Sequence, residues 1–304
     1  MLNKIIILVF FNLLFSYSIF NHIRDFKIPS LNYVGSSNLN NNFYNFSNPA
    51  SNPASNMDTN NYIYSSIGKH FNGLLNNEQI IFALNTKKFN QLNIAVLKSS
   101  IDDIYNTTNA WLDDGNGIVH STEIDYNKIN TFKHTNLGII ISKPFVLKNL
   151  NFGINSKFSL GSVLGVNSFK HSFDLGYYKS NNSFNFGILI KDLLSYSYWA
   201  SNTINFEEMS IIFGSNFNYK SSFFSYDYNI IKSEYYIGFE YQYNSNISFQ
   251  LSNSSFERIY LGSMIKLSNF NIGYYFVLPK YEELGTTQKI MIGINKNIFK
   301  KLKG

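Results

Sequence analysis

The side chains best suited to chemistry are five histidines and one group of acidic residues, because the chain contains no cysteine. The histidines are His22, His70, His120, His134 and His171. None of them falls in a His-Glu-x-x-His or similar metal-ligand spacing, so structural roles are favoured for them. Gly-x-Ser-x-Gly, Walker and Gly-x-Gly-x-x-Gly motifs are absent as well. The sequence therefore predicts a non-enzymatic protein without an organic cofactor.

Hard oxygen ligands gather in the long segment from Ser99 to Asn130. They are Asp113, Asp114, Asn116, Glu123 and Asp125. Calcium is the cation that such ligands favour. An EF-hand loop begun at Asp114 would place Ile118 where the fifth-position ligand belongs, so the spacing is not that of an EF-hand. Two interpretations stay open, a weak calcium site and a solvated acidic turn.

The composition predicts an ordered protein that does not read nucleic acid. Of 304 residues, 44% are hydrophobic and only 14% charged, which is enough apolar surface to offset the entropy of ordering. The net charge of +6 comes from scattered lysines, since Arg24 and Arg258 are the only arginines. Bidentate contacts to bases and phosphates are therefore nearly unavailable.

The first 18 residues are typical of a secretory signal peptide. Lys4 precedes the apolar run Ile5–Phe15, and Ser16–Ser18 offers small residues for cleavage. An uncleaved anchor is the alternative, but a spanning helix needs roughly twenty apolar residues. We expect an exported protein in which residues 19–60, polar and rich in Asn and Ser, precede the folded domain at 61–304.

From residue 61 onward, apolar and polar residues alternate with the period of a β-strand. We place strands near 61–70, 78–85, 89–98, 131–143, 149–160, 167–180, 182–195, 206–218, 221–233, 235–244, 246–254, 256–267, 270–278 and 287–299. Most reach the roughly 9–11 residues that cross a bilayer as tilted strands. Every second connection is short, whereas Ser99–Asn130, Tyr196–Asn205 and Pro279–Gly285 are long.

This pattern predicts an all-β fold, an antiparallel transmembrane β-barrel of about 14 strands in the outer membrane. Phe158 and Ile237 are expected to face lipid, while Lys157 and Glu240 are expected to face the lumen. A soluble or surface-attached all-β interaction protein is the alternative.

Two short motifs add a family resemblance. Asn48, Pro49 and Ala50 form an Asn-Pro-Ala motif, which Asn52, Pro53 and Ala54 repeat. Together with the signal peptide, the fourteen alternating segments and Asp174-Leu175-Gly176, these motifs resemble the PorV/PorQ-like proteins. That family sits within the wider FadL-type fatty-acid-transporter barrels of Gram-negative outer membranes. Either copy of the motif can correspond to the family's.

The resemblance implies a fourteen-stranded barrel whose N-terminal segment folds inside as a hatch. It implies one of two roles, transport of a hydrophobic small molecule or attachment and shuttling with type IX secretion proteins. We expect residues 19–60 to be the hatch, because a fourteen-stranded lumen is too wide for wall side chains alone to fill. A flexible periplasmic tail is the alternative for this segment.

Overall fold

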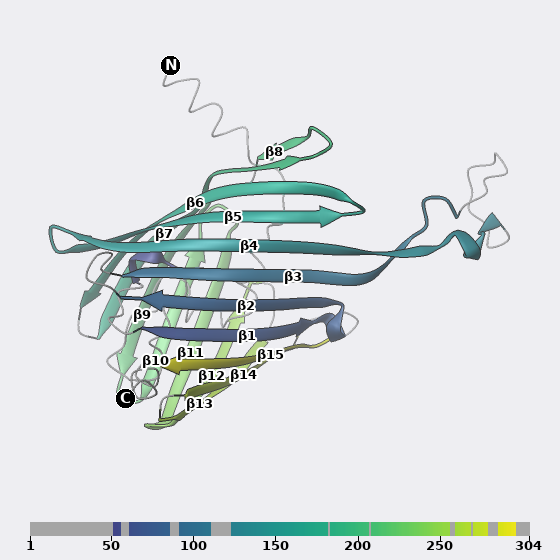
Figure 1. Cartoon of the computed structure of the whole chain (residues 1–304). Coiled ribbons are helices and arrows are strands. Elements are labelled where there is room, and N and C mark those ends of the chain that lie inside the picture. Colours follow the sequence, from purple (N-terminus) through teal and green to yellow (C-terminus); the bar gives the residue numbers. More distant parts are fainter. Residues whose placement is uncertain are drawn as a thin grey trace, which may run out of the picture.

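Alternating strands form one antiparallel sheet that closes on itself as a barrel (Figure 1). This computed structural model describes residues 51–55, 61–85, 91–110, 123–181, 183–206, 208–255, 259–268, 270–278 and 285–295. The first Asn-Pro-Ala copy and the predicted signal peptide, residues 1–18, lie outside these residues. Within them, no helix is long and apolar enough to cross a membrane.

Fifteen strand segments and three short 3₁₀ turns make up the described chain. The strands are β1 (Tyr62–His70), β2 (Leu75–Leu84), β3 (Leu92–Asn106), β4 (Asn130–Leu147), β5 (Leu150–Val163), β6 (Val166–Asn181), β7 (Phe184–Trp199), β8 (Ile204–Phe206), β9 (Ser210–Tyr219), β10 (Ser222–Asn229), β11 (Glu234–Asn244), β12 (Ile247–Ser254), β13 (Ile259–Leu267), β14 (Phe270–Leu278) and β15 (Thr287–Asn295). The 3₁₀ turns are η1 (Pro53–Ser55), η2 (Phe71–Gly73) and η4 (Tyr126–Lys128).

The sheet has fourteen strand positions, as the alternation predicts. Neighbours in sequence pair with each other around the ring, and β1 pairs with β15 to close it. The short β8 and the longer β9 lie end to end along β7, so they occupy one position. Among the described strands, every one except the short β8 pairs on both sides, so closure leaves little free sheet edge.

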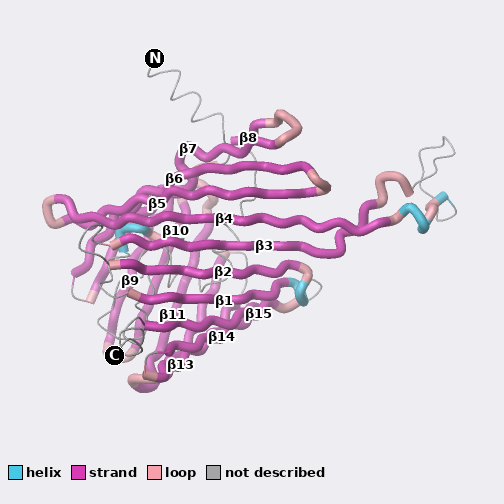
Figure 2. Tube along the Cα trace, viewed as in Figure 1, coloured by secondary structure: helices cyan, strands magenta, loops and turns pink. Residues whose placement is uncertain are grey.

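Tight turns gather at one end of the barrel (Figure 2). Residues 148–149, 220–221 and 245–246 each join two strands there, while one described two-residue turn, Leu164-Gly165, lies at the opposite end. Lys148 and Asn149 both have positive φ, at 49° and 64°, which is the two-residue hairpin geometry that matches strand twist. The opposite end carries the longest connection, residues 107–129. This asymmetry is typical of outer-membrane barrels.

The barrel is apolar outside and largely polar inside. Large apolar side chains such as Ile154, Ile237 and Ile272 point outward with 40%, 49% and 41% of their surface exposed. Polar side chains including Asn155, Lys157 and Glu240 are buried on the inner face. Phe158 is also exposed, so the predicted outward and inward faces match the structure at these positions.

Some predicted boundaries are wrong. Strand β3 continues to Asn106, so the connection expected from Ser99 begins only at residue 107. Residues 104–106 pair with the start of β4 beyond the reach of β2 and β5, and this ribbon projects from the barrel (Figure 1). Likewise, Tyr196–Trp199 continues β7 rather than forming a loop. In both β3 and β7, pairing with a neighbouring strand continues beyond the residues that alternate between apolar and polar.

Candidate functional site

The second Asn-Pro-Ala copy forms a compact turn against the inner wall of the barrel. Asn52 accepts a hydrogen bond from the Ala54 backbone N–H on its Oδ1 at 3.0 Å, the closure of an Asx turn. The Ser55 hydroxyl donates to the Asn52 carbonyl oxygen at 2.8 Å. Pro53 fixes its own φ and begins η1. The described segment, Ser51–Ser55, is buried throughout.

The Asn52 side chain ties this turn to two strands. Its Nδ2 donates to the carbonyl oxygen of Tyr177 on β6 at 2.9 Å and to that of Ile188 on β7 at 3.3 Å. Tyr177 and Ile188 face each other across the β6–β7 pair. One amide group therefore binds both strands of this pair.

A pair of glycines makes room for the turn. Gly153 on β5 and Gly176 on β6 lie directly opposite each other. A Cβ at Gly153 would overlap the backbone of Pro53 and Ala54, and a Cβ at Gly176 would overlap Asn52 Oδ1 and approach Pro53 Cδ to 2.9 Å. The close approach of two backbones requires glycine at both positions.

Beside the glycines, a buried charge network crosses β5, β6 and β7. Lys157 Nζ lies 2.5 Å from both Asp174 Oδ1 and Asp192 Oδ1. Asn155 donates through Nδ2 to Asp174 at 2.9 Å and to the Ser51 carbonyl oxygen at 3.4 Å. The network therefore continues into the docked turn. Lys157 neutralises one of the two buried carboxylates, which is the condition for keeping such groups charged away from water.

Asp192 reaches this network because β7 is irregular. The pairing of β6 with β7 shifts register around Phe173, so β7 carries extra residues there. Asp192 has a φ of 59°, a conformation that Asp adopts more readily than most residues, and its backbone N–H donates to Asp174 Oδ1 at 3.0 Å. Lys191 and Asp192 are consequently both buried, whereas a regular strand would point one of them outward.

Another part of the inner wall carries an apolar and aromatic cluster among buried polar side chains. A buried cluster comes from β1–β4, β10 and β13–β15, and it consists of Tyr62, Tyr64, Ile81, Ala83, Ala95, Leu97, Ile140, Phe223, Tyr260, Met264, Tyr275, Val277 and Met291. The Tyr64 hydroxyl donates to Met291 Sδ at 2.6 Å. The inner wall thus has a charged part, which holds the turn, and an apolar part.

The residues of the suggested calcium site are only partly described. Asp113, Asp114 and Asn116 lie outside the described residues. Asp125 Oδ1 accepts from the Asn127 backbone N–H at 3.1 Å, and its Oδ2 lies 3.5 Å from Lys128 Nζ. Among the described residues, no three His, Asp or Glu side chains are grouped to hold a metal. Calcium binding here stays a prediction.

Sequence reasoning identified some of these residues and missed others. Asn52, Pro53 and Ala54 carry the docked turn, and the Asp174-Leu175-Gly176 motif supplies one carboxylate and one glycine of its site. Gly153 and Asp192 were missed. Opposed glycines on neighbouring strands would have indicated Gly153, whereas a bulge that turns Asp192 inward leaves no pattern in the sequence.

Comparison with known proteins shows the fold. No family model and no curated protein sequence matches the chain. A solved structure of the TodX deltaS2S3 mutant, a monoaromatic hydrocarbon channel, superposes with a TM-score of 0.56 at 10% identity, covering 87% of this chain and 99% of that one. The P. putida toluene transporter TodX gives 0.52 at 12% identity, covering 82% and 92%. The chain shares the barrel fold of TodX. At these identities the likeness concerns the fold alone.

Proposed function

We propose that this chain is a non-enzymatic outer-membrane channel of the FadL type that carries small hydrophobic molecules, with residues 19–60 as a hatch in its lumen. The observation that carries the proposal is the inner wall, which holds a docked Asn-Pro-Ala turn on one part and a buried apolar and aromatic cluster on another. The two TodX structures support it through the fold, since TodX is a toluene transporter.

The outer face supports a membrane location. Isoleucine, leucine, phenylalanine and tyrosine side chains cover the outside of nearly every strand. Soluble monomers rarely expose contiguous apolar patches beyond a few hundred Å², so a belt around the whole barrel favours lipid as the surrounding medium. The soluble all-β alternative would leave this belt in water.

The apolar part of the inner wall supports a hydrophobic cargo. Tyr64, Tyr260 and Tyr275 present rings, and Met264 and Met291 present polarisable thioethers, which suit flat apolar solutes. The proposed cargo class is therefore small apolar or aromatic molecules.

A role in type IX secretion is the second candidate. It rests on the docked turn, because Asn52–Ala54 and Asp174-Leu175-Gly176 are the motifs that resemble the PorV/PorQ-like proteins. In this role, the barrel would attach or shuttle secreted proteins, and secretion-machinery proteins would be its partners.

A cellular assay separates the two roles. Cells lacking the gene, and cells carrying it again, are compared for the initial uptake rate of labelled toluene and for surface attachment of secreted proteins. The transport role predicts slower uptake with unchanged attachment. Lost attachment with unchanged uptake would instead support the secretion role and contradict transport.

A variant of the apolar wall refines this test. Leu97→Asn places an amide in the buried apolar cluster and should slow uptake about fivefold, the factor that corresponds to a loss of about 1 kcal/mol of apolar contact. Ser252→Asn is the matched control, because Ser252 is buried on the inner face of β12, outside that cluster. Equal uptake by the two variants, at equal barrel abundance, would contradict a cargo path along the apolar wall.

A further inference from the structure

A groove of about 500 Å³ lies on the outer face of the barrel, where β1 meets β15. Its size is within the roughly 300–1,000 Å³ typical of small-molecule sites. Lining residues Ile67 and Ile290 are 59% and 56% exposed, and they alternate with the buried residues Tyr64, Ser66 and Met291 of the inner face. The groove therefore opens away from the lumen and is separate from the docked turn.

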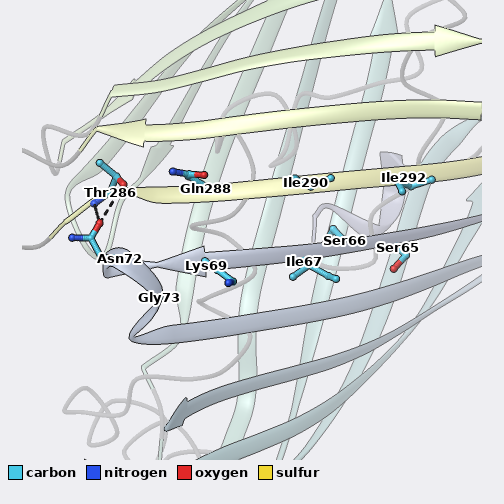
Figure 3. Close-up of a pocket in the computed structure, with 10 residues that line it drawn as sticks. All are labelled: Ser65, Ser66, Ile67, Lys69, Asn72, Gly73, Thr286, Gln288, Ile290 and Ile292. Atoms are coloured by element: carbon cyan, nitrogen blue, oxygen red, sulfur yellow. Dashed lines mark hydrogen bonds between the residues drawn. The ribbon is translucent and has the colours of Figure 1, made fainter. Parts of the chain in front are cut away.

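Three cross-strand pairs give the groove a polarity gradient. Ser65 lies opposite Ile292, Ile67 opposite Ile290, and Lys69 opposite Gln288. Figure 3 shows these two rows along neighbouring strands, with Lys69 and Gln288 nearest the loop end. From Ser65 to Lys69 the strand rises about 13 Å. The groove thus changes from apolar to cationic along the barrel axis.

Small side chains and a rigid rim shape this groove. The small side chain of Ser65 leaves space at the apolar end of the groove. The rim at the other end is held by hydrogen bonds between η2 and the segment before β15. Asn72 Oδ1 accepts hydrogen bonds from the Thr286 backbone N–H at 3.0 Å and from its hydroxyl at 3.3 Å, as the dashed lines of Figure 3 mark. The Asn72 backbone N–H donates in turn to the Thr286 carbonyl oxygen at 3.0 Å.

Lys69 is the cationic group of the groove. It is exposed and makes no ion pair with any residue in the part of the chain that the structure describes. On the neighbouring strand β2, Glu78 lies opposite Ile67. Glu78 is 3.5 Å from Lys98 Nζ, so its charge is already compensated. The charge of Lys69 is left to attract an anion.

We propose that this groove binds one anionic membrane lipid, with its phosphate at Lys69 and an acyl chain along Ile67, Ile290 and Ile292. The inference rests on the proposed membrane location of the barrel. An acyl chain fits the apolar part, and a phosphate at the loop end would lie where strands leave the hydrocarbon region. Because Lys69 lies at the end that carries the long connection 107–129, opposite the Lys148-Asn149 turn, the lipid belongs to the outer leaflet.

Two features of the groove favour a lipid over a protein as its ligand: the apolar belt that surrounds it and the single lysine at its polar end. The groove interrupts an apolar belt that lipid would surround, so lipid chains are the molecules present at its apolar end. A single uncompensated lysine at the polar end complements one phosphate group. A second copy of this chain would bring the same lysine to a symmetric contact, where the like charges would repel each other.

The experiment measures bound lipid directly. The full mature chain is folded into nanodiscs that contain phosphatidylglycerol and phosphatidylcholine in equal amounts, then released and weighed by native mass spectrometry. Heat-modifiable migration on gels first establishes that each variant is a folded barrel. We expect one retained phosphatidylglycerol per barrel, in preference to phosphatidylcholine.

Two variants alter the groove without altering the inner wall. Lys69→Gln should reduce retained phosphatidylglycerol about fivefold, since a lysine near an anionic membrane contributes about 1 kcal/mol per charge. Ser65→Phe should reduce it by filling the apolar end. Lys179→Gln is the matched control for charge, because Lys179 is an exposed outward-facing lysine near the opposite end on β6. Ser263→Phe on the outer face of β13 is the control for volume.

Each result of the lipid-retention experiment would overturn a different part of the proposal. A barrel that inserts but retains the two lipids equally, or whose retention ignores both groove variants, would overturn the lipid site while leaving the channel proposal standing. A dimer in native spectra that Ser65→Phe dissociates would assign the groove to a second copy and overturn the lipid assignment. A chain that never becomes a heat-modifiable barrel would contradict the proposed membrane function itself.

Discussion

At the scale of residues, one amide and two glycines hold the N-terminal turn on the wall, and the adjacent charges fix the wall itself. Asn52 donates to both β6 and β7, while Gly153 and Gly176 allow Pro53 to approach the sheet. Lys157 then links Asp174 to Asp192, which joins β5 to the irregular part of β7. The strands that carry the turn are therefore connected by side chains as well as by the backbone ladder.

Replacing Lys157 by Met is predicted to destabilise the barrel strongly. The change leaves two buried aspartates with no cation between them, and breaking a buried charge pair in this way costs about 3–5 kcal/mol. The measurement is the free energy of unfolding by urea in lipid vesicles. The double variant Lys157→Met, Asp174→Asn should recover most of the loss, because the remaining carboxylate of Asp192 keeps the buried lysines Lys191 and Lys170 as positively charged neighbours. A cost below about 0.5 kcal/mol for Lys157→Met would show that the network does not stabilise the wall.

At the scale of elements, alternation predicted the number of strands and their faces, but not where bulged strands change face. Fourteen positions and the outward side of β5 follow directly from period-two patterning, because the outward face of β5 is apolar except at Ser156 and Ser162. The extra residues of β7 break that period, so no sequence pattern indicated that Lys191 and Asp192 both point inward. Pairing with β4 likewise extends β3 into a ribbon whose own residues are not clearly alternating.

The sequence motif indicated the docked turn, but it did not indicate the residues that the turn contacts. Asn52, Pro53 and Ala54 are recognisable in the sequence as one copy of a repeated motif. The sequence does not show which of the two copies contacts the barrel wall, whereas the structure shows that this copy does. Contacts between positions more than a hundred residues apart, such as Asn52 with Tyr177, depend on barrel closure and register. No local signal encodes them.

An arginine on the outer face is predicted to cost more at mid-strand than at the rim. Phe158 lies near the middle of β5 and Leu150 is its first residue, and both side chains point outward. Phe158→Arg should lower the free energy of unfolding in vesicles by about 2–4 kcal/mol, and Leu150→Arg by about 0–1 kcal/mol, because the cost of a charge depends on its depth in the bilayer. Equal costs at the two depths would contradict a lipid-facing belt on β5.

At the scale of the whole molecule, the barrel has an apolar belt outside and a divided wall inside. The belt fits a membrane, the charged part of the wall holds Ser51–Ser55, and the apolar part forms a buried cluster on other strands. A fourteen-stranded barrel is wide enough to enclose a channel unless chain fills it. The central claim is that the segment before β1 provides that filling.

Single-channel conductance in planar bilayers tests this claim most directly. The full-length protein as exported is compared with a variant that lacks Ser36–Ser55 but keeps residues 1–18, the predicted signal peptide, after both are shown to be heat-modifiable barrels. The account predicts a larger conductance for the shortened chain, because removing the docked turn and the residues before it would open the lumen to ions. Equal conductance of the two proteins would mean that this segment does not plug the barrel, and would contradict the account.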